Sequence, residues 1–336
     1  MPTETSHRYV TFSRNIFIPV TNICRNACGY CVYRARSYED AYVVGTEAVL
    51  NLFRQRGAAT EALFTSGERP ERAAALSSLF TARLAEEGFS SLSTYTKHLC
   101  QLAIQHGLLP HCNLGVLSRK ELSALKDVNA SMGLMLETTA VLDAHEKSPG
   151  KDPVVRLQMI AEAGRLKIPF TTGILIGIGE TQEDRIRSLE RLAALHEKFG
   201  HIQEVIIQPF LPKPATVMEH ASSPPFAMMK HTVRAARTIL PAEIAIQVPP
   251  NLISPKELIE LGASDLGGIS ERTIDYINPE APWPAEEDLR RKIAPYELHE
   301  RLPIYPRYIQ EGWYSDRIKP LIERYADEMG LRRKGH

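Results

Sequence analysis

Short apolar runs alternate with helix-like segments along most of the chain, and this alternation limits its possible folds more than any other feature. Most runs are rich in Val, Ile, Leu and Phe with little polar alternation, as expected of parallel strands covered on both faces. The eight candidate strands are Asn15–Val20, Glu61–Thr65, Pro110–Leu114, Ser131–Glu137, Phe170–Ile176, Glu204–Gln208, Glu243–Val248 and Gly262–Ile269. We therefore predict an α/β fold, a (β/α)8 barrel of the TIM type.

Helix-start signals lie between these runs. A capping box begins at Ser118, a cap followed by a first-turn proline begins at Asp152, and Thr181 opens a long helix. Thr46 is expected to cap a further helix. After about residue 270 the chain is rich in proline and aromatic residues. We therefore expect residues 1–270 to form the barrel and residues 271–336 to form a C-terminal cover segment packed on it.

The composition favours a small-molecule partner. Forty Lys and Arg balance forty Asp and Glu, whereas a nucleic-acid partner requires a concentrated positive field. The longest apolar runs, such as 173–179, fall far short of the roughly 20 residues of a membrane span. The first residues lack the apolar core of a signal peptide. We therefore expect a cytoplasmic protein that binds neither nucleic acid nor membranes.

Three of the five cysteines lie in one short loop after the first candidate strand. Cys24, Cys28 and Cys31 form a C-x3-C-x2-C array at the strand end where such barrels place their chemistry. Three thiols in one turn-forming loop are well placed to converge on a metal centre. The alternatives are three unlinked buried cysteines and zinc, which usually takes four ligands in paired knuckles. Cys100 and Cys112 show no such pairing and are interpreted as structural.

The array resembles the signature of the radical S-adenosylmethionine (SAM) superfamily, in which an aromatic residue, here Tyr30, precedes the last cysteine. The resemblance implies that Cys24, Cys28 and Cys31 hold a [4Fe-4S] cluster, with Tyr30 beside the cofactors. It also implies that SAM binds the iron left without a protein ligand. One-electron reduction by a reduced flavodoxin or ferredoxin then gives a 5′-deoxyadenosyl radical, which abstracts a hydrogen atom from the substrate.

Other residues match SAM-binding motifs of the superfamily. Ser66-Gly67-Glu68 stands where the superfamily usually has Gly-Gly-Glu in contact with the methionyl amino group. Glu137 and Arg156 are spaced like the pair that holds the ribose and carboxylate of SAM in the biotin-synthase-like branch. The glycine-containing run around Ile174 resembles the fifth-strand motif, which implies that Ile174 flanks adenine. The residues alone also allow a plain turn at Gly67 and a surface ion pair for Arg156.

Two longer blocks narrow the resemblance to one family. Asp-Leu-Gly-Gly-Ile-Ser at 265–270 and Asn-Pro-Glu-Ala-Pro-Trp-Pro at 278–284 look like segments of the CofG-type subunit of FO synthase, a radical SAM carbon–nitrogen lyase. FO is 7,8-didemethyl-8-hydroxy-5-deazariboflavin. Further matches are spread from about residue 11 to 285. Glu271-Arg272 and Pro209 depart from the family pattern.

The resemblance implies conversion of 5-amino-5-(4-hydroxybenzyl)-6-(D-ribitylimino)-5,6-dihydrouracil to FO with loss of ammonia. A tyrosine-using, CofH-type radical SAM partner supplies this adduct. The alternatives within the class are that tyrosine-using enzyme itself or another biotin-synthase-like enzyme. A non-catalytic iron–sulfur or zinc protein is the alternative from another class.

The adduct needs several polar contacts in an otherwise apolar cavity. The candidate substrate residues are Asn22, Tyr33, Gln208, Asp265, Asp275 and Asn278. For each, the alternative is a solvated loop residue or a turn former. No residue is singled out as a proton donor or acceptor. His201 and His220 lack a partner motif and are interpreted as surface residues.

Overall fold

The structure, a computed structural model, describes residues 9–334. Its strands are β1 (Tyr9–Thr21), β2 (Glu61–Ser66), β3 (Leu109–Asn113), β4 (Ser131–Gly133), β5 (Phe170–Ile176), β6 (Ile202–Pro209), β7 (Ala245–Gln247), β8 (Asp265–Ile269) and β9 (Glu297–Arg301). Its α-helices are α1 (Thr46–Arg54), α2 (Ser77–Glu86), α3 (Leu92–Gln105), α4 (Arg119–Lys126), α5 (Pro153–Arg165), α6 (Gln182–Phe199), α7 (Phe226–Ile239), α8 (Lys256–Glu260), α9 (Glu286–Ile293), α10 (Pro306–Gln310) and α11 (Lys319–Tyr325). Short 3₁₀ turns are η1 (Pro70–Arg72), η2 (Asp143–His145) and η3 (Pro149–Lys151).

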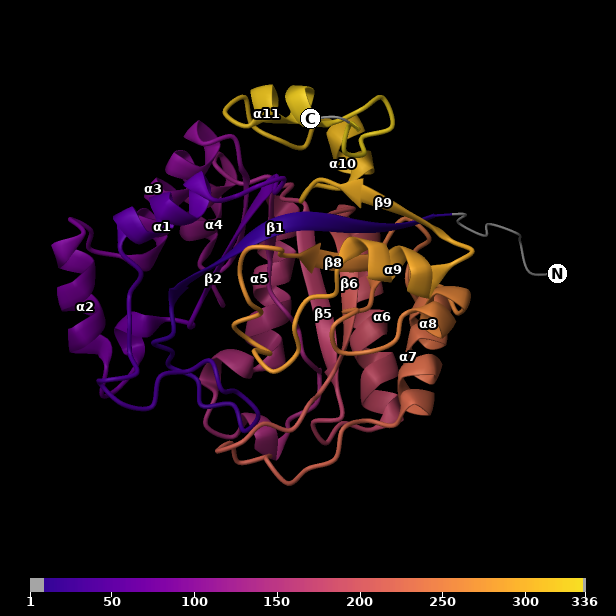
Figure 1. Cartoon of the computed structure of the whole chain (residues 1–336). Coiled ribbons are helices and arrows are strands. Elements are labelled where there is room, and N and C mark those ends of the chain that lie inside the picture. Colours follow the sequence, from indigo (N-terminus) through magenta and orange to yellow (C-terminus); the bar gives the residue numbers. More distant parts are fainter. Residues whose placement is uncertain (1–8, 335–336) are drawn as a thin grey trace.

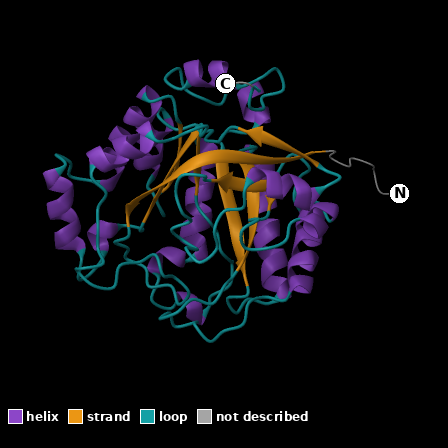
Figure 2. Ribbon diagram, viewed as in Figure 1, coloured by secondary structure: helices purple, strands orange, loops and turns teal. Residues whose placement is uncertain are grey.

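Eight parallel strands close into a barrel. Neighbours follow chain order from β2 to β8, and β1 closes the ring by pairing with both β8 and β2. Figures 1 and 2 show the helices arranged around the outside of the strands. The predicted (β/α)8 fold is confirmed. Because all strands run the same way, their carboxyl ends and the loops that follow them gather at one end of the barrel.

A ninth strand, which the sequence did not reveal, joins the barrel near its amino-terminal end. β9 pairs in parallel with residues 9–13 of β1, whereas β2 pairs with residues 15–21. The long strand β1 therefore pairs with β9 along its first half and with β2 along its second half, on the same edge. Figure 1 shows the yellow α10 and α11 at this end of the barrel, away from the indigo loop that follows β1. Apolar residues of this tail, including Ile304 and Ile318, pack in one cluster with Leu109 of β3.

The helix starts largely follow the predicted signals. Ser118 and Thr181 each form a capping box, and the Asp152 carboxylate accepts a first-turn N–H. Thr46 is instead the first helical residue of α1, and its hydroxyl donates to Glu87. The predicted cap at Thr46 is therefore wrong.

The interior contains buried polar groups as well as the expected apolar side chains. Arg301 of β9 reaches into the barrel and bonds Asp265 at 2.6 Å and Glu204 at 3.2 Å. His201 is fully buried, with its Nε2 2.9 Å from the Ile160 carbonyl oxygen. The prediction that His201 lies on the surface is therefore wrong.

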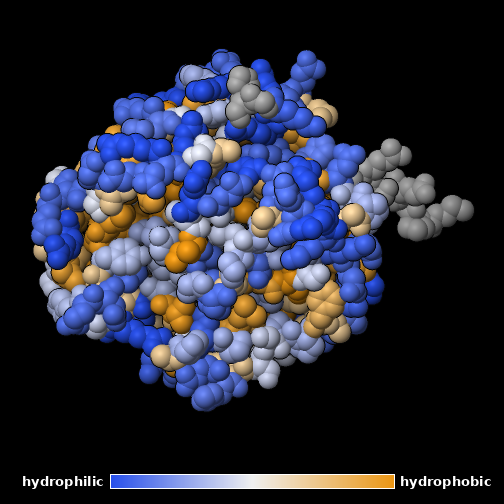
Figure 3. Space-filling view, in the orientation of Figure 1, coloured by the Kyte–Doolittle hydropathy of each residue, from blue (hydrophilic) through white to orange (hydrophobic). Residues whose placement is uncertain are grey.

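The outer surface is mainly hydrophilic. Figure 3 shows apolar side chains gathered near the centre of the displayed face, among hydrophilic residues. Within residues 9–334, no helix has both the length and the apolar character needed to span a membrane.

Candidate active site

The three clustered cysteines lie on the loop that follows β1, at the carboxyl ends of the barrel strands. Backbone hydrogen bonds fix this loop on two sides. The Arg25 N–H donates to the Glu68 carbonyl at 2.9 Å, and the Gly29 N–H donates to the Ala144 carbonyl at 2.8 Å. The first bond joins the loop to the end of β2, and the second joins it to η2. The loop is therefore held in place by the end of β2 and by η2.

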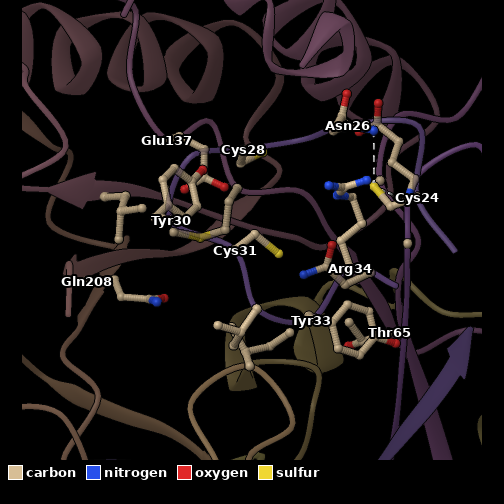
Figure 4. Close-up of a pocket in the computed structure, with 18 of the residues that line it drawn as sticks. Cys24, Asn26, Cys28, Tyr30, Cys31, Tyr33, Arg34, Thr65, Glu137 and Gln208 are labelled. Carbon is tan, nitrogen blue, oxygen red and sulfur yellow. Dashed lines mark hydrogen bonds between the residues drawn. The ribbon is translucent and has the colours of Figure 1, made fainter. Parts of the chain in front are cut away.

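The loop forms one wall of a cavity of about 310 Å³ at this end of the barrel. Cys24, Cys28 and Cys31 all line it. In Figure 4, Cys24 lies on one side of the cavity, Tyr30 and Glu137 lie on the other, and Cys31 lies between them. The array predicted to act together is thus brought to one place.

Hydrogen bonds and burial act in opposite directions on these thiols. The Cys24 sulfur accepts backbone N–H groups from Glu68 at 3.2 Å and Asn26 at 3.4 Å, and such bonds stabilise a thiolate. Burial is the stronger influence: it raises the pKa of Cys24 to about 11 and also raises the pKa of Cys31. A metal cation beside these sulfur atoms would favour their thiolate form.

The three cysteine thiols suit an iron–sulfur cluster as its ligands. The Cys28 sulfur also has a donor, the Ser148 hydroxyl at 3.3 Å. In the described part of the chain, no three His, Cys, Asp or Glu side chains converge as ligands of a single metal ion. A multi-iron cluster takes its thiolates on separate iron atoms, so its ligands need not converge on one point. Three thiols around one cavity satisfy that requirement.

Glu68 and Arg156 form a buried ion pair beside the cysteines. Arg156 Nη2 lies 3.1 Å from Glu68 Oε2, and each side chain is 4% exposed. Arg25 bonds the other carboxylate oxygen at 2.9 Å. Burial opposes ionisation of Glu68, but Arg156 and Arg25 outweigh it, and the pKa of Glu68 is lowered. The alternative interpretation of Arg156 as a surface residue is wrong.

Glu137 contributes a second carboxylate to the cavity wall. Its φ of 67° is in the left-handed region, which is uncommon for a residue other than glycine. Lys151 Nζ lies 2.5 Å from Glu137 Oε1. Burial opposes ionisation here too, but Lys151 and Arg156 outweigh it and lower the pKa of Glu137. Glu137 therefore presents a charged carboxylate at the cavity.

The structure gathers most of the predicted cofactor residues at this cavity. Those that line it are Tyr30, Ser66, Gly67, Glu68, Glu137 and Arg156. Ile174 is buried in the main hydrophobic core, and the next residue, Leu175, lines the cavity.

The predicted substrate residues are more widely spread than the predicted cofactor residues. Those lining the cysteine cavity are Tyr33, Gln208 and Asn278. Asp275 lines an adjoining cavity inside the barrel. Asn22 and Asp265 are not among the described residues that line either cavity: the Asn22 amide bonds backbone groups of its own loop, and Asp265 is held by Arg301 at the start of β8.

Two lysines at the cavity were missed by the sequence reasoning. Lys151 neutralises Glu137, and Lys213 donates to Asn278 Oδ1 at 2.8 Å and to the Ile277 carbonyl at 2.9 Å. Lys213 therefore ties the loop after β6 to the segment after β8. Neither lysine belongs to a motif, so only the fold brings them to the site.

Comparison with known proteins agrees with this geometry. A family model described as the Radical SAM superfamily matches residues 18–192. The chain is 54% identical to the 7,8-didemethyl-8-hydroxy-5-deazariboflavin synthase of Methanococcoides burtonii, over 97% of this chain and 98% of that protein. It is 49% identical to a protein of the same name from Archaeoglobus fulgidus, over 97% of this chain and 99% of that protein.

Solved structures share the fold at lower sequence identity. The chain is similar to HydG, a maturase of the [FeFe]-hydrogenase, with a TM-score of 0.69 and 16% identity over 94% of this chain and 68% of that chain. It is also similar to methylornithine synthase, PylB, with a TM-score of 0.56 and 18% identity over 94% of this chain and 81% of that chain.

Proposed function

The chain belongs to the radical SAM superfamily and, within it, to the FO synthase family, and we propose that its reaction takes place at the cysteine-lined cavity. It is a radical SAM carbon–nitrogen lyase of the CofG type. It converts 5-amino-5-(4-hydroxybenzyl)-6-(D-ribitylimino)-5,6-dihydrouracil to FO with loss of ammonia. The observation that carries this function is the identity of about half the residues to FO synthases over nearly the whole chain.

The family implies a [4Fe-4S] cluster and SAM as cofactors. When bound, they supply the 5′-deoxyadenosyl radical that abstracts a hydrogen atom from the substrate. We assign Cys24, Cys28 and Cys31 as the cluster ligands. Their common loop, their common cavity and the N–H groups that face the Cys24 sulfur support this assignment.

The charged groups beside the thiols match the amino-acid end of SAM. Glu68 offers acceptor oxygens to an ammonium group, and Arg156 offers a fork of donors to a carboxylate. Glu68 and Arg156 are both buried and charged. The amino-acid end of SAM carries one positive and one negative charge, so its binding adds no net charge to the site. Glu137 is placed to accept hydrogen bonds from ribose hydroxyls, and Leu175 offers an apolar contact to the adenine ring.

Apolar side chains cover the remainder of the cavity wall. Phe17, Leu134 and Phe210 line it together with the thiol loop. These side chains exclude water and competing hydrogen donors from the reacting carbon, as the chemistry requires. We propose that the adduct comes from the tyrosine-using CofH-type enzyme and that reduced flavodoxin or ferredoxin supplies the electron.

The assignment of the cluster ligands is tested by comparing Cys28→Ala with Cys112→Ala after anaerobic reconstitution. Cys112 is buried in β3 and lies outside the cavity wall as described, so it controls for the loss of a thiol. We expect Cys28→Ala to lose the [4Fe-4S] absorption, SAM cleavage and FO formation, and Cys112→Ala to keep all three. A Cys28→Ala protein with normal FO yield contradicts the assignment.

A further inference from the structure

A second cavity, which we call the inner chamber, continues the cysteine cavity into the barrel. It has a volume of about 180 Å³. Asn113, Gln208 and Asn278 line both spaces, so the two cavities adjoin. The chamber extends as far as Arg301 and Glu204 near the amino-terminal end of the barrel. A ligand that fills both cavities therefore lies along the barrel axis.

Three residues that line the inner chamber have buried polar atoms without a hydrogen-bond partner within residues 9–334. Asn15 of β1 is 2% exposed, and both its amide oxygen and its amide nitrogen are unpaired. The Asn251 amide oxygen and the Trp283 indole N–H are also buried and unpaired there. Buried polar groups in proteins are nearly always hydrogen-bonded, so this concentration indicates a place for a polar ligand.

Two glycines provide the space for amides in the chamber. A Cβ atom at Gly268 would lie 2.2 Å from Asn15 Nδ2, and one at Gly267 would lie 2.2 Å from Gln247 Nε2. Both glycines belong to the Asp-Leu-Gly-Gly-Ile-Ser block, and Trp283 belongs to the Asn-Pro-Glu-Ala-Pro-Trp-Pro block. The two blocks that narrowed the family resemblance therefore meet at this chamber.

The charged side chains of the chamber wall already have partners, and the Glu61 carboxyl accepts a hydrogen bond from the Ser13 hydroxyl at 2.7 Å. Arg301 is paired with Glu204 at 3.2 Å. The Asp275 carboxylate accepts hydrogen bonds from the amides of Asn251 at 3.1 Å and Asn278 at 3.0 Å. The unpaired atoms that remain are neutral and comprise both donors and acceptors. They suit a neutral ligand whose groups can both donate and accept.

We propose that the inner chamber binds the ribityl chain of the substrate, with Asn15, Asn251 and Trp283 as its hydrogen-bonding groups. Each hydroxyl of a polyol both donates and accepts, so it can pair with an amide or with an indole N–H. This proposal rests on the proposed function. With the ribityl chain in the inner chamber, the hydroxybenzyl group of the substrate lies in the cysteine cavity, beside Phe17 and Phe210. The hydrogen atom is abstracted there.

The test measures how strongly the reconstituted enzyme distinguishes FO from its 10-methyl analogue, which lacks the ribityl chain. Asn15→Leu keeps the size of the side chain and removes its hydrogen bonding. Binding is followed through the fluorescence of both compounds. We expect the wild-type enzyme to bind FO more tightly than the analogue. We expect Asn15→Leu to weaken FO binding roughly tenfold, because the variant loses the hydrogen bonds between the Asn15 amide and the ribityl hydroxyls. Binding of the analogue should be unchanged, because the analogue has no ribityl hydroxyl to bond.

Two further variants keep the test specific. Thr96→Val removes a buried unpaired hydroxyl of α3 that lies outside the chamber wall as described, and should keep the full preference for FO. Trp283→Phe removes one donor and should reduce the preference even if Asn15→Leu fails to fold. Equal binding of both compounds by the wild type, or a preference unaffected by Asn15→Leu and Trp283→Phe, overturns the proposal. Failure of the wild type to form FO from the adduct would instead refute the proposed function.

Discussion

Individual side chains set the charge of the cysteine cavity before any cofactor binds. Glu68 is held between Arg25 and Arg156, and Glu137 is held by Lys151. Because these groups are buried, each carboxylate depends on its cation, and removal of one partner leaves an uncompensated charge. The site is therefore sensitive to substitutions that preserve size but remove charge.

Arg156→Met tests this dependence. The variant leaves Glu68 with Arg25 as its main cation and removes the proposed fork for the SAM carboxylate. We expect SAM affinity to fall by roughly 10-fold to 100-fold, since a charge-assisted hydrogen bond contributes about 1.5–3 kcal/mol. Calorimetric titration of the reconstituted protein with SAM measures this change. Arg165→Met, on the exposed part of the same helix, is the matched control, and equal affinities in the two variants would contradict the assignment.

His201 gives a pH prediction. Burial lowers its pKa to about 3, well below the ordinary value of 6.5. Below pH 6.5 the unfolded chain binds a proton at this histidine that the native protein does not bind, so stability falls as the pH decreases from 6.5 toward 3. The slope is up to about 1.4 kcal/mol per pH unit.

His201→Gln should therefore show a smaller loss of stability between pH 6.5 and pH 5.5, by about 1 kcal/mol. Anaerobic urea unfolding of the reconstituted protein at the two pH values measures the difference. His220→Gln is the control, because the His220 side chain is 93% exposed. An unchanged pH dependence in His201→Gln would show that another group controls acid stability.

The sequence identified only those residues of this site that belong to a known motif. The cysteine array and Glu68 were identified because their spacing matches a known signature. Lys151 was missed because nothing local marks it. The motif selected Ile174, but the orientation of β5 buries Ile174 in the core and directs Leu175 to the cavity.

At the level of secondary structure, long-range pairing explains what the sequence left out. β5 was predicted with its observed bounds because it is buried along its whole length. The first strand was predicted to start at Asn15, although β1 begins at Tyr9. Residues 9–13 pair with β9, whose Glu-Leu-His-Glu-Arg sequence has little apolar character. No local pattern could indicate a strand that is held by a distant partner and by buried charges.

Arg301→Met tests the role of β9. The change leaves Glu204 and Asp265 buried without their guanidinium partner, so we expect a loss of about 3–5 kcal/mol in the free energy of unfolding. Arg307→Met removes a more exposed arginine from α10 and should cost less than about 1 kcal/mol. Anaerobic urea unfolding compares the two variants. Similar losses would show that the Arg301 pairs contribute little to stability.

For the molecule as a whole, the two cavities form one path along the barrel axis. The thiol loop and the ion pairs proposed to bind SAM lie at its mouth, and the amides that have room beside Gly267 and Gly268 lie inside. Under the two proposals above, the reactive end of the elongated substrate lies near the cofactors and its polyol end lies deep in the barrel. The boundary proposed at residue 270 separates segments that jointly build this path.

The most direct test of the central claim supplies the reconstituted enzyme, under reducing anaerobic conditions, with SAM and either the hydroxybenzyl–ribitylimino adduct or tyrosine plus the ribityl-aminouracil. FO fluorescence and mass, together with 5′-deoxyadenosine, are measured in both reactions. We predict FO and 5′-deoxyadenosine from the adduct and no consumption of tyrosine. Turnover of tyrosine with the ribityl-aminouracil, or an adduct that remains unconverted while SAM is cleaved, would contradict the account.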